Sequence, residues 1–260
     1  MSENLKIGFT ERGDGGLDLS WADRIAEGAC DGVVVITKNL NAIARAKIMD
    51  VHRKGFPIIV HAGLTGWGGT VIEPRVPSPA VQFNNILELF SDGFPADRLV
   101  LRIDPIIPTE EGLAKVRDVV RTAVNYNILP ISRCRVSVLD EYRHVKERLR
   151  DLGLQPFYGD SFYAPKPMMD RVATLLSGLH TEYGVTFETC AEHALATSCP
   201  GVFKEQGCIS VEDLNTLGLT YDSAFENPQN RGGCKCLGCK RELLNRKHQC
   251  PHGCVYCYWR

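Results

Sequence analysis

The stretch Gly32-Val33-Val34-Val35-Ile36-Thr37-Lys38-Asn39 decides the fold class of this chain. It is a continuous run of mostly β-branched residues, which is typical of a strand buried on both faces in a parallel sheet. A helical pattern follows over residues 41–54 and ends at Gly55, and another apolar run begins at Pro57. This strand–helix–strand order predicts a parallel sheet with right-handed crossovers.

The same alternation continues on both sides of this unit. Further strands are predicted at 5–9, 57–61, 98–103, 133–138 and 185–188, with a short one at 155–158. Further helices are predicted at 21–29, 79–91, 111–126, 140–152 and 167–183. About six or seven such units in a chain of 260 residues predict an α/β fold, a full or partial (β/α) barrel. No Gly-x-Gly-x-x-Gly follows any strand, which weighs against a dinucleotide-binding fold.

The cysteines divide the chain into two parts. Of eleven cysteines, only Cys30 and Cys134 precede residue 190. From there the pattern becomes loops rich in Cys, Gly, Asn and Pro, with one amphipathic helix near 211–217. Since this part has little apolar sequence to bury, we expect metal coordination to order it. We therefore predict a barrel domain at 1–189 and a cluster-binding segment at 190–260, packed on the barrel mouth.

Composition narrows the function classes. No stretch approaches the ~18 apolar residues of a membrane span, and the N-terminus lacks the apolar run of a signal peptide. A cytoplasmic protein without membrane association is therefore expected. The formal net charge of −1 gives no global field that attracts nucleic acid, although the basic residues near the C-terminus are a local candidate.

The chain ends in a short cysteine motif, Cys250-Pro251-His252-Gly253-Cys254-Val255-Tyr256-Cys257. Pro251 and Gly253 favour a bent loop, and three thiolates on a four-iron cluster leave one iron open. The spacing resembles the signature of radical S-adenosylmethionine (SAM) enzymes, in which SAM binds the open iron. The alternative is a zinc knot of these cysteines with His248 or His252.

Four further cysteines suit a complete four-thiolate site, and hence a second, auxiliary 4Fe–4S cluster: Cys190, Cys208, Cys234 and Cys236. A structural zinc, or a set that uses Cys239 or Cys199 instead, is the alternative. Spacing does not decide between them because only Cys234 and Cys236 are close in sequence.

Over most of its length the chain resembles a bacterial and phage radical SAM-like family described as domain of unknown function 1848. The matching stretches are Thr37-Lys38-Asn39, Leu64-Thr65-Gly66, Ile72-Glu73-Pro74, Arg102-Ile103-Asp104-Pro105, Thr189-Cys190-Ala191-Glu192, Gly207-Cys208-Ile209 and the terminal motif. The opening stretch, Phe9-Thr10-Glu11-Arg12-Gly13-Asp14, departs from the family pattern. The substrate of this chain can therefore differ from that of other family members.

Several polar residues follow predicted strands, at the end where barrel enzymes place their chemistry. Cations suit the carboxylate of SAM, and carboxylates or hydroxyls suit its ribose. The predicted cofactor-binding residues are Thr37, Lys38, Glu73, Arg102, Asp104 and Tyr256. Lys38, Arg102 and Asp104 are also catalytic candidates, with Cys134 and Tyr163 as hydrogen-atom donors. The alternative is that these charges form ion pairs that close the barrel mouth.

Other side chains have two interpretations each. His252 and His193 are candidates to donate to cluster sulfur, whereas His61 on an apolar strand is more typical of a core histidine. Trp67 in a Gly-rich loop suits stacking on a base, or simply filling the barrel mouth.

The resemblance implies a radical SAM enzyme that takes an electron from a donor such as flavodoxin or ferredoxin. Its 5′-deoxyadenosyl radical would abstract hydrogen from a modified thymine in phage DNA, or from a small metabolite or amino acid derivative. Two alternatives of another class are a zinc-stabilised binding module and an iron–sulfur electron carrier.

Overall fold

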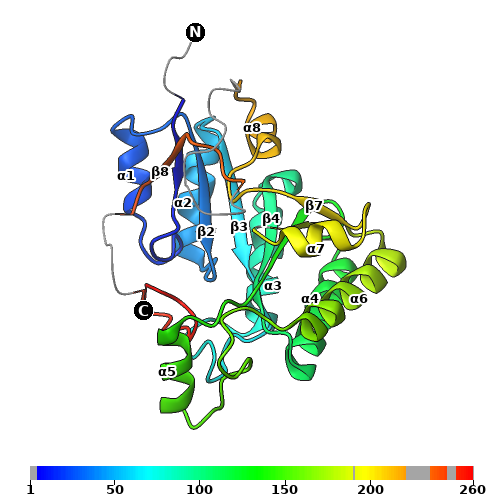
Figure 1. The fold of residues 1–260 in the computed structure, drawn as a ribbon. Helices are drawn as coiled ribbons and strands as arrows, with labels where there is room; N and C mark the ends of the chain where they lie inside the picture. Colours follow the sequence, from blue (N-terminus) through cyan, green and yellow to red (C-terminus); the bar gives the residue numbers. More distant parts are fainter. Residues whose placement is uncertain (1–4, 190, 221–234, 245–249, 260) are drawn as a thin grey trace.

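The computed structural model describes residues 5–189, 191–220, 235–244 and 250–259 of the chain. Within them, eight strands form one sheet in the order β7-β6-β5-β4-β3-β2-β1-β8. Every neighbouring pair is parallel (Figure 1). The fold is therefore α/β, with the strand arrangement of a partial (β/α) barrel.

Strands and helices alternate along the chain. The strands are β1 (Ile7–Phe9), β2 (Gly32–Thr37), β3 (Ile58–Gly63), β4 (Leu99–Ile106), β5 (Arg133–Val138), β6 (Phe187–Thr189), β7 (Phe203–Glu205) and β8 (Lys240–Glu242). The helices are α1 (Ser20–Ala26), α2 (Ala42–Arg53), α3 (Pro79–Ser91), α4 (Glu110–Asn125), α5 (Arg143–Asp151), α6 (Lys166–Tyr183), α7 (His193–Ser198) and α8 (Val211–Leu217), with a 3-10 turn, η1, at Ala96–Arg98. The predicted alternation is confirmed, with ends that differ by a few residues.

Local sequence explains where several helices begin. The Asn41 side chain accepts from the backbone N–H groups of Ile43 and Ala44, at 2.9 and 3.0 Å, and so caps α2. Ser210 and Asp213 form a capping box at the start of α8. These contacts satisfy backbone donors that a helix leaves unpaired, and they fix the ends of helices around the sheet.

One predicted strand, at 155–158, is wrong. The backbone N–H groups of Phe157 and Tyr158 donate to the carboxylate of Glu141 at 2.6 and 3.1 Å. Because a side chain takes these donors, the segment forms a turn and joins no strand.

The segment after residue 190 contains more regular structure than the single predicted helix. It also forms α7 and two three-residue strands, β7 beside β6 and β8 beside β1. Such short strands carry no periodicity in the sequence, and their pairing partners lie elsewhere in the chain. The cysteine-rich segment therefore supplies both edges of the sheet.

The sheet is buried on both faces, as the β-branched run predicts. Val33 and Val35 pack in the cluster that the helices cover, whereas Val34 packs on the opposite face. We call this opposite face the concave face. It is covered by residues 208–219 and 235–239, which include three buried cysteines.

Candidate active site

The C-terminal loop, residues 250–259, lies at the carboxyl ends of the strands, next to α5 (Figure 1). The backbone N–H of Val255 donates to the carbonyl of Ile72, in the loop between β3 and α3, at 3.0 Å. Arg148 of α5 donates to the carbonyls of Val255 and Cys257 at 3.1 and 2.6 Å. These contacts attach the cysteine motif to the end of the sheet where barrel enzymes place their chemistry.

Glu73 is the centre of a buried polar group at this end. Its side chain is 1% exposed, and one carboxylate oxygen accepts from Lys38 Nζ at 3.0 Å and from Thr65 Oγ1 at 2.8 Å. The hydroxyl of Tyr256 donates to the same oxygen. One carboxylate thus joins the end of β2, the β3–α3 loop and the cysteine motif.

Lys38 faces the thiols of the motif. Its ammonium lies 5.6 Å from the centre of the Tyr256 ring. Burial disfavours the charged form, but Glu73 and Cys254 outweigh it, so the pKa of Lys38 is raised. A side chain at Gly63 would place its Cβ 2.9 Å from Lys38 Cγ, so this glycine leaves room for the lysine to cross β3. Lys38 is therefore a nearly buried cation beside Cys254.

The motif thiols are buried or half-buried. Burial raises the pKa of Cys254 to about 12 and that of Cys250 to about 11, and Lys38 opposes both shifts. A metal-bound thiol loses its proton outright, and Lys38 is placed to stabilise the resulting negative charge. The donor set therefore fits a thiolate-bound metal group.

No three His, Cys, Asp or Glu side chains form a group able to hold a metal ion in residues 5–189, 191–220, 235–244 and 250–259. Thiolates of a four-iron cluster each bind a different iron, so they do not have to meet at one point.

Asp14, which the sequence did not single out, anchors His252 of the motif. Its buried carboxylate accepts from Thr37 Oγ1 at 2.6 Å and contacts His252 Nε2 at 2.8 Å. His252 Nδ1 lies 3.1 Å from the carbonyl of Arg75. Both ring nitrogens are engaged in these contacts, which leaves neither available to cluster sulfur or to zinc in this arrangement. His248 lies outside the described residues.

Arg102 and Asp104, at the end of β4, form an ion pair beside this group. Arg102 Nε donates to Asp104 Oδ2 at 2.7 Å, and Ser137 donates to the other carboxylate oxygen. The Asp104 side chain is 26% exposed, more than Arg102 at 12%. Lys38 Nζ lies 3.5 Å from the carbonyl of Asp104. Five of the six predicted cofactor-binding residues thus form one contact group: Lys38, Glu73, Arg102, Asp104 and Tyr256. The sixth, Thr37, is connected to this group through Asp14.

The two predicted hydrogen-atom donors lie elsewhere. Cys134 packs on the helix-covered face of β5, because it is one residue out of phase with Arg133 and Arg135 on the concave face. Tyr163 is 68% exposed and packs its ring on Phe162. Neither residue therefore contributes to the polar group around Glu73.

The second cysteine set is described in part. The backbone N–H of Cys208 lies 3.1 Å from Cys236 Sγ, and Cys239 is buried in the same cluster. Cys190 and Cys234 lie outside the described residues. His193, near Cys190 in sequence, is largely exposed and faces Glu205.

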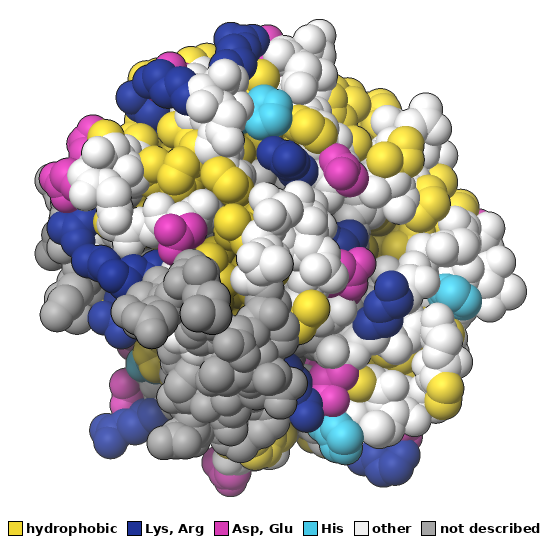
Figure 2. Space-filling view, turned by 90° about the horizontal axis from the view of Figure 1, so that it is seen from above, with side chains coloured by type: hydrophobic (Ala, Val, Ile, Leu, Met, Phe, Trp, Pro, Cys, Tyr) yellow, Lys and Arg dark blue, Asp and Glu magenta, His cyan; other side chains and the backbone are white. Residues whose placement is uncertain are grey.

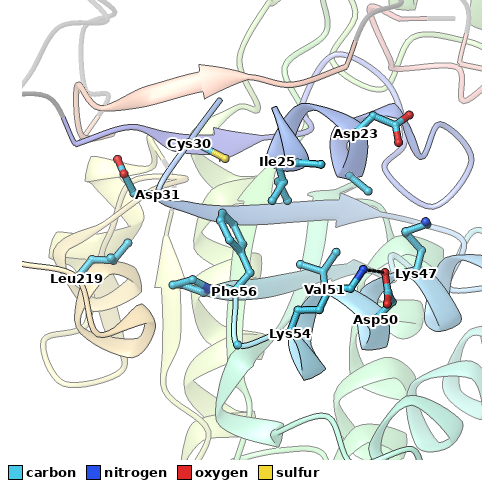
Figure 3. A pocket seen from close by; sticks show the side chains of 14 residues that line it. Asp23, Ile25, Cys30, Asp31, Lys47, Asp50, Val51, Lys54, Phe56 and Leu219 are labelled. Atoms are coloured by element: carbon cyan, nitrogen blue, oxygen red, sulfur yellow. Dashed lines mark hydrogen bonds and ion pairs between the residues drawn. The ribbon is translucent and has the colours of Figure 1, made fainter. Parts of the chain in front are cut away.

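A pocket of about 760 Å³ lies away from these groups (Figure 3). Residues from α1, α2, the segments before β2 and β3, and the segment after α8 line it, among them Cys30, Lys47, Asp50, Lys54, Phe56 and Leu219. It therefore opens at the amino ends of the strands, opposite the cysteine motif, where barrel enzymes do not place their chemistry.

Residues 22–259 match the profile of a family described as a domain of unknown function, DUF1848. The chain belongs to this family. The match covers β2 to β8 and the terminal motif, so membership in the DUF1848 family is confirmed, whereas the link to radical SAM enzymes stays a prediction. No match is found among curated proteins. In the described part of the chain, no helix combines the length and the apolar character needed to cross a membrane.

Proposed function

We propose that this member of the DUF1848 family is a radical SAM enzyme. One observation carries the proposal: Cys250, Cys254 and Cys257 lie on the carboxyl ends of a parallel sheet, beside a buried Lys38–Glu73–Tyr256 group. Three thiolates at this spacing suit a four-iron cluster with one open iron. When bound, such a cluster supplies the site at which SAM is reduced to a 5′-deoxyadenosyl radical, which then abstracts hydrogen from substrate.

The residues around the motif have the chemistry to hold SAM. The cations of Lys38 and Arg102 suit its carboxylate, and the carboxylates of Glu73 and Asp104 suit its ribose hydroxyls. Each cation is now paired with one of these acids, so binding SAM would exchange partners within the group. Asp104, the most exposed of the four side chains, is the first that a ligand would meet.

A second task of the mouth is to exclude water from a reactive radical. Trp67 is 6% exposed and packs in one cluster with Ile72 and Val255. Lys115 Nζ lies 4.6 Å from the centre of its ring. These contacts favour the interpretation of Trp67 as a wall of the mouth over that of a base-stacking residue.

The substrate classes remain a modified thymine in phage DNA and a small metabolite or amino acid derivative. On the face of the molecule seen in Figure 2, Lys and Arg side chains are interspersed with Asp and Glu. Lys240, one of the basic residues near the C-terminus, pairs with Glu11. The pairing of Lys240 favours the small molecule, whereas the face in Figure 2 lies at the amino ends of the strands, opposite the cysteine motif. DNA binding that weakens steeply with salt would favour the thymine instead.

The proposal is tested by anaerobic reconstitution with iron and sulfide, followed by metal analysis and incubation with SAM and dithionite. The wild type should release 5′-deoxyadenosine, and Cys254→Ala should lose about four irons and all of this activity. Cys134→Ala, a buried thiol on the helix-covered face, is the matched control and should retain both. Iron without SAM cleavage would indicate an electron carrier, and a colourless zinc protein would indicate a binding module; either outcome overturns the proposal.

A further inference from the structure

The concave face of the sheet carries a buried histidine without a hydrogen-bond partner. His61 on β3 is 0% exposed, and neither of its ring nitrogens has a partner within the described ranges. In the sheet it lies between Ile36 of β2 and Val100 of β4. A buried polar group that stays unpaired costs free energy, so such a group calls for an explanation.

The strand pattern fixes the direction of this side chain. Ile59, two residues before His61, and the neighbouring Val100 both pack on the concave face with Cys208 and Cys236. Side chains alternate along a strand, so His61 points toward the same side. Arg133 lies one strand beyond Val100 in the same row, and its Nε also has no described partner. The unpaired imidazole of His61 therefore lies beneath the two cysteines, with Val100 between it and Arg133, whose other guanidinium nitrogens pair with Glu188 and Asp213.

Each of the two thiols above this row lies near an N–H donor, and a further donor contacts the backbone of Cys208. The backbone N–H of Cys208 lies 3.1 Å from Cys236 Sγ, and Arg102 Nη2 lies 3.7 Å from Cys208 Sγ. Arg135 Nη1 donates to the carbonyl of Cys208 at 3.0 Å. Both thiols are at most 6% exposed. This is an environment of N–H donors, which suits thiolate and sulfide better than neutral thiol.

We propose that the concave face holds a second iron–sulfur cluster, bound by Cys208 and Cys236, and that His61 donates a ring N–H to its sulfur. The choice of iron and sulfide rests on the proposed function, whereas the place and the role of His61 rest on the contacts above. A hydrogen bond to cluster sulfur stabilises the more negative, reduced state and so raises the reduction potential. His61 is thus a positioning and tuning residue.

The place of the cluster is tested by iron content after anaerobic reconstitution of the full chain. Cys208→Ala/Cys236→Ala should lose about four irons, while Cys250→Ala/Cys254→Ala/Cys257→Ala should retain about four and an iron–sulfur EPR signal. Cys134→Ala again serves as the matched control. Unchanged iron in the first variant would overturn the second cluster. Unchanged iron in the triple variant alone would instead overturn the proposed function and leave this inference standing.

The role of His61 is tested in the triple-cysteine background by redox titration. His61→Phe should keep the iron but shift the midpoint potential to a more negative value, and His61→Gln, which retains an N–H donor, should restore part of the shift. Equal potentials in wild type, Phe and Gln variants would overturn the hydrogen bond, as would loss of iron in both variants. Zinc in place of iron would overturn the cluster.

Discussion

At the scale of single residues, the charge of Lys38 depends on one carboxylate. Glu73 is almost fully buried and balances Lys38, which is itself only 17% exposed. Sequence reasoning grouped Lys38, Glu73 and Tyr256 as cofactor-binding candidates, and the structure shows that they also hold the C-terminal loop. The same contacts therefore stabilise the folded protein before any cofactor binds.

Glu73→Gln should lower the free energy of unfolding by about 3 kcal/mol, because it leaves a buried ammonium without its counter-charge. Urea denaturation, followed by circular dichroism, measures the change. Lys38→Met/Glu73→Gln should recover part of the loss, since it removes both charges. Removal of the exposed Lys54–Asp50 pair is the matched control and should have little effect. Wild-type stability of Glu73→Gln would contradict this account.

Cys30 lines the pocket at the amino ends of the strands, and we expect it to be an unreactive thiol. Burial raises the pKa of Cys30 to about 11. Only the thiolate reacts with iodoacetamide, so the labelling rate should rise about tenfold per pH unit between pH 7 and 10. Mass spectrometry of the Cys30 peptide measures this rate. Fast labelling at pH 7 would show that Cys30 is an activated thiol after all.

At the scale of elements, α5 connects the cysteine motif to the protein surface. It carries four basic and two acidic residues, and Arg143 is 93% exposed. Arg148 contacts the carbonyl of Cys257, and the Tyr142 ring, at the start of α5, lies 4.7 Å from that of Tyr258. A basic surface this close to the motif suits an acidic electron donor of the flavodoxin type.

Arg143→Glu/Lys146→Glu/Arg150→Glu should slow 5′-deoxyadenosine formation about tenfold or more when flavodoxin supplies electrons at low salt. With dithionite, a small reductant that does not need this surface, the rate should not change. Arg121→Glu/Arg171→Glu, on the distant helices α4 and α6, is the control. A loss of equal size with both reductants would place the defect in the site rather than in docking.

At the scale of the whole molecule, the C-terminal segment completes the sheet before it reaches the motif. β8 pairs with β1, and Leu243 and Leu244 belong to the main hydrophobic core. The motif itself adds Val255 and Tyr256 to a smaller cluster at the mouth. We therefore expect the sheet to fold even when the motif is removed.

A chain that ends at Leu244 should still fold, with its free energy of unfolding lowered by about 2–3 kcal/mol through lost burial at the mouth. A chain that ends at Lys235 also loses β8 and several buried side chains, and it should be far less stable. Thermal unfolding of both truncated chains measures the difference. If both truncated chains lost the same stability, the expectation that the sheet folds without the motif would be contradicted.

The sequence by itself determined the α/β alternation, the burial of the β2 run on both faces, and the cysteine spacing. Each of these is a local property, because periodicity and spacing are read over a few residues. Position after a predicted strand added Lys38 and Arg102 as site candidates, and the chemistry that suits SAM added Glu73, which lies in the loop between β3 and α3.

Only the tertiary structure decided which of these residues meet. Asp14 and His252 are 238 positions apart, and Glu73 and Tyr256 are 183 apart, so no local pattern pairs them. The same holds for β8, which has its place only because β1 offers an edge. Partners this distant are set by the topology of the sheet, which brings the ends of different strands together, and a sequence pattern does not contain that information.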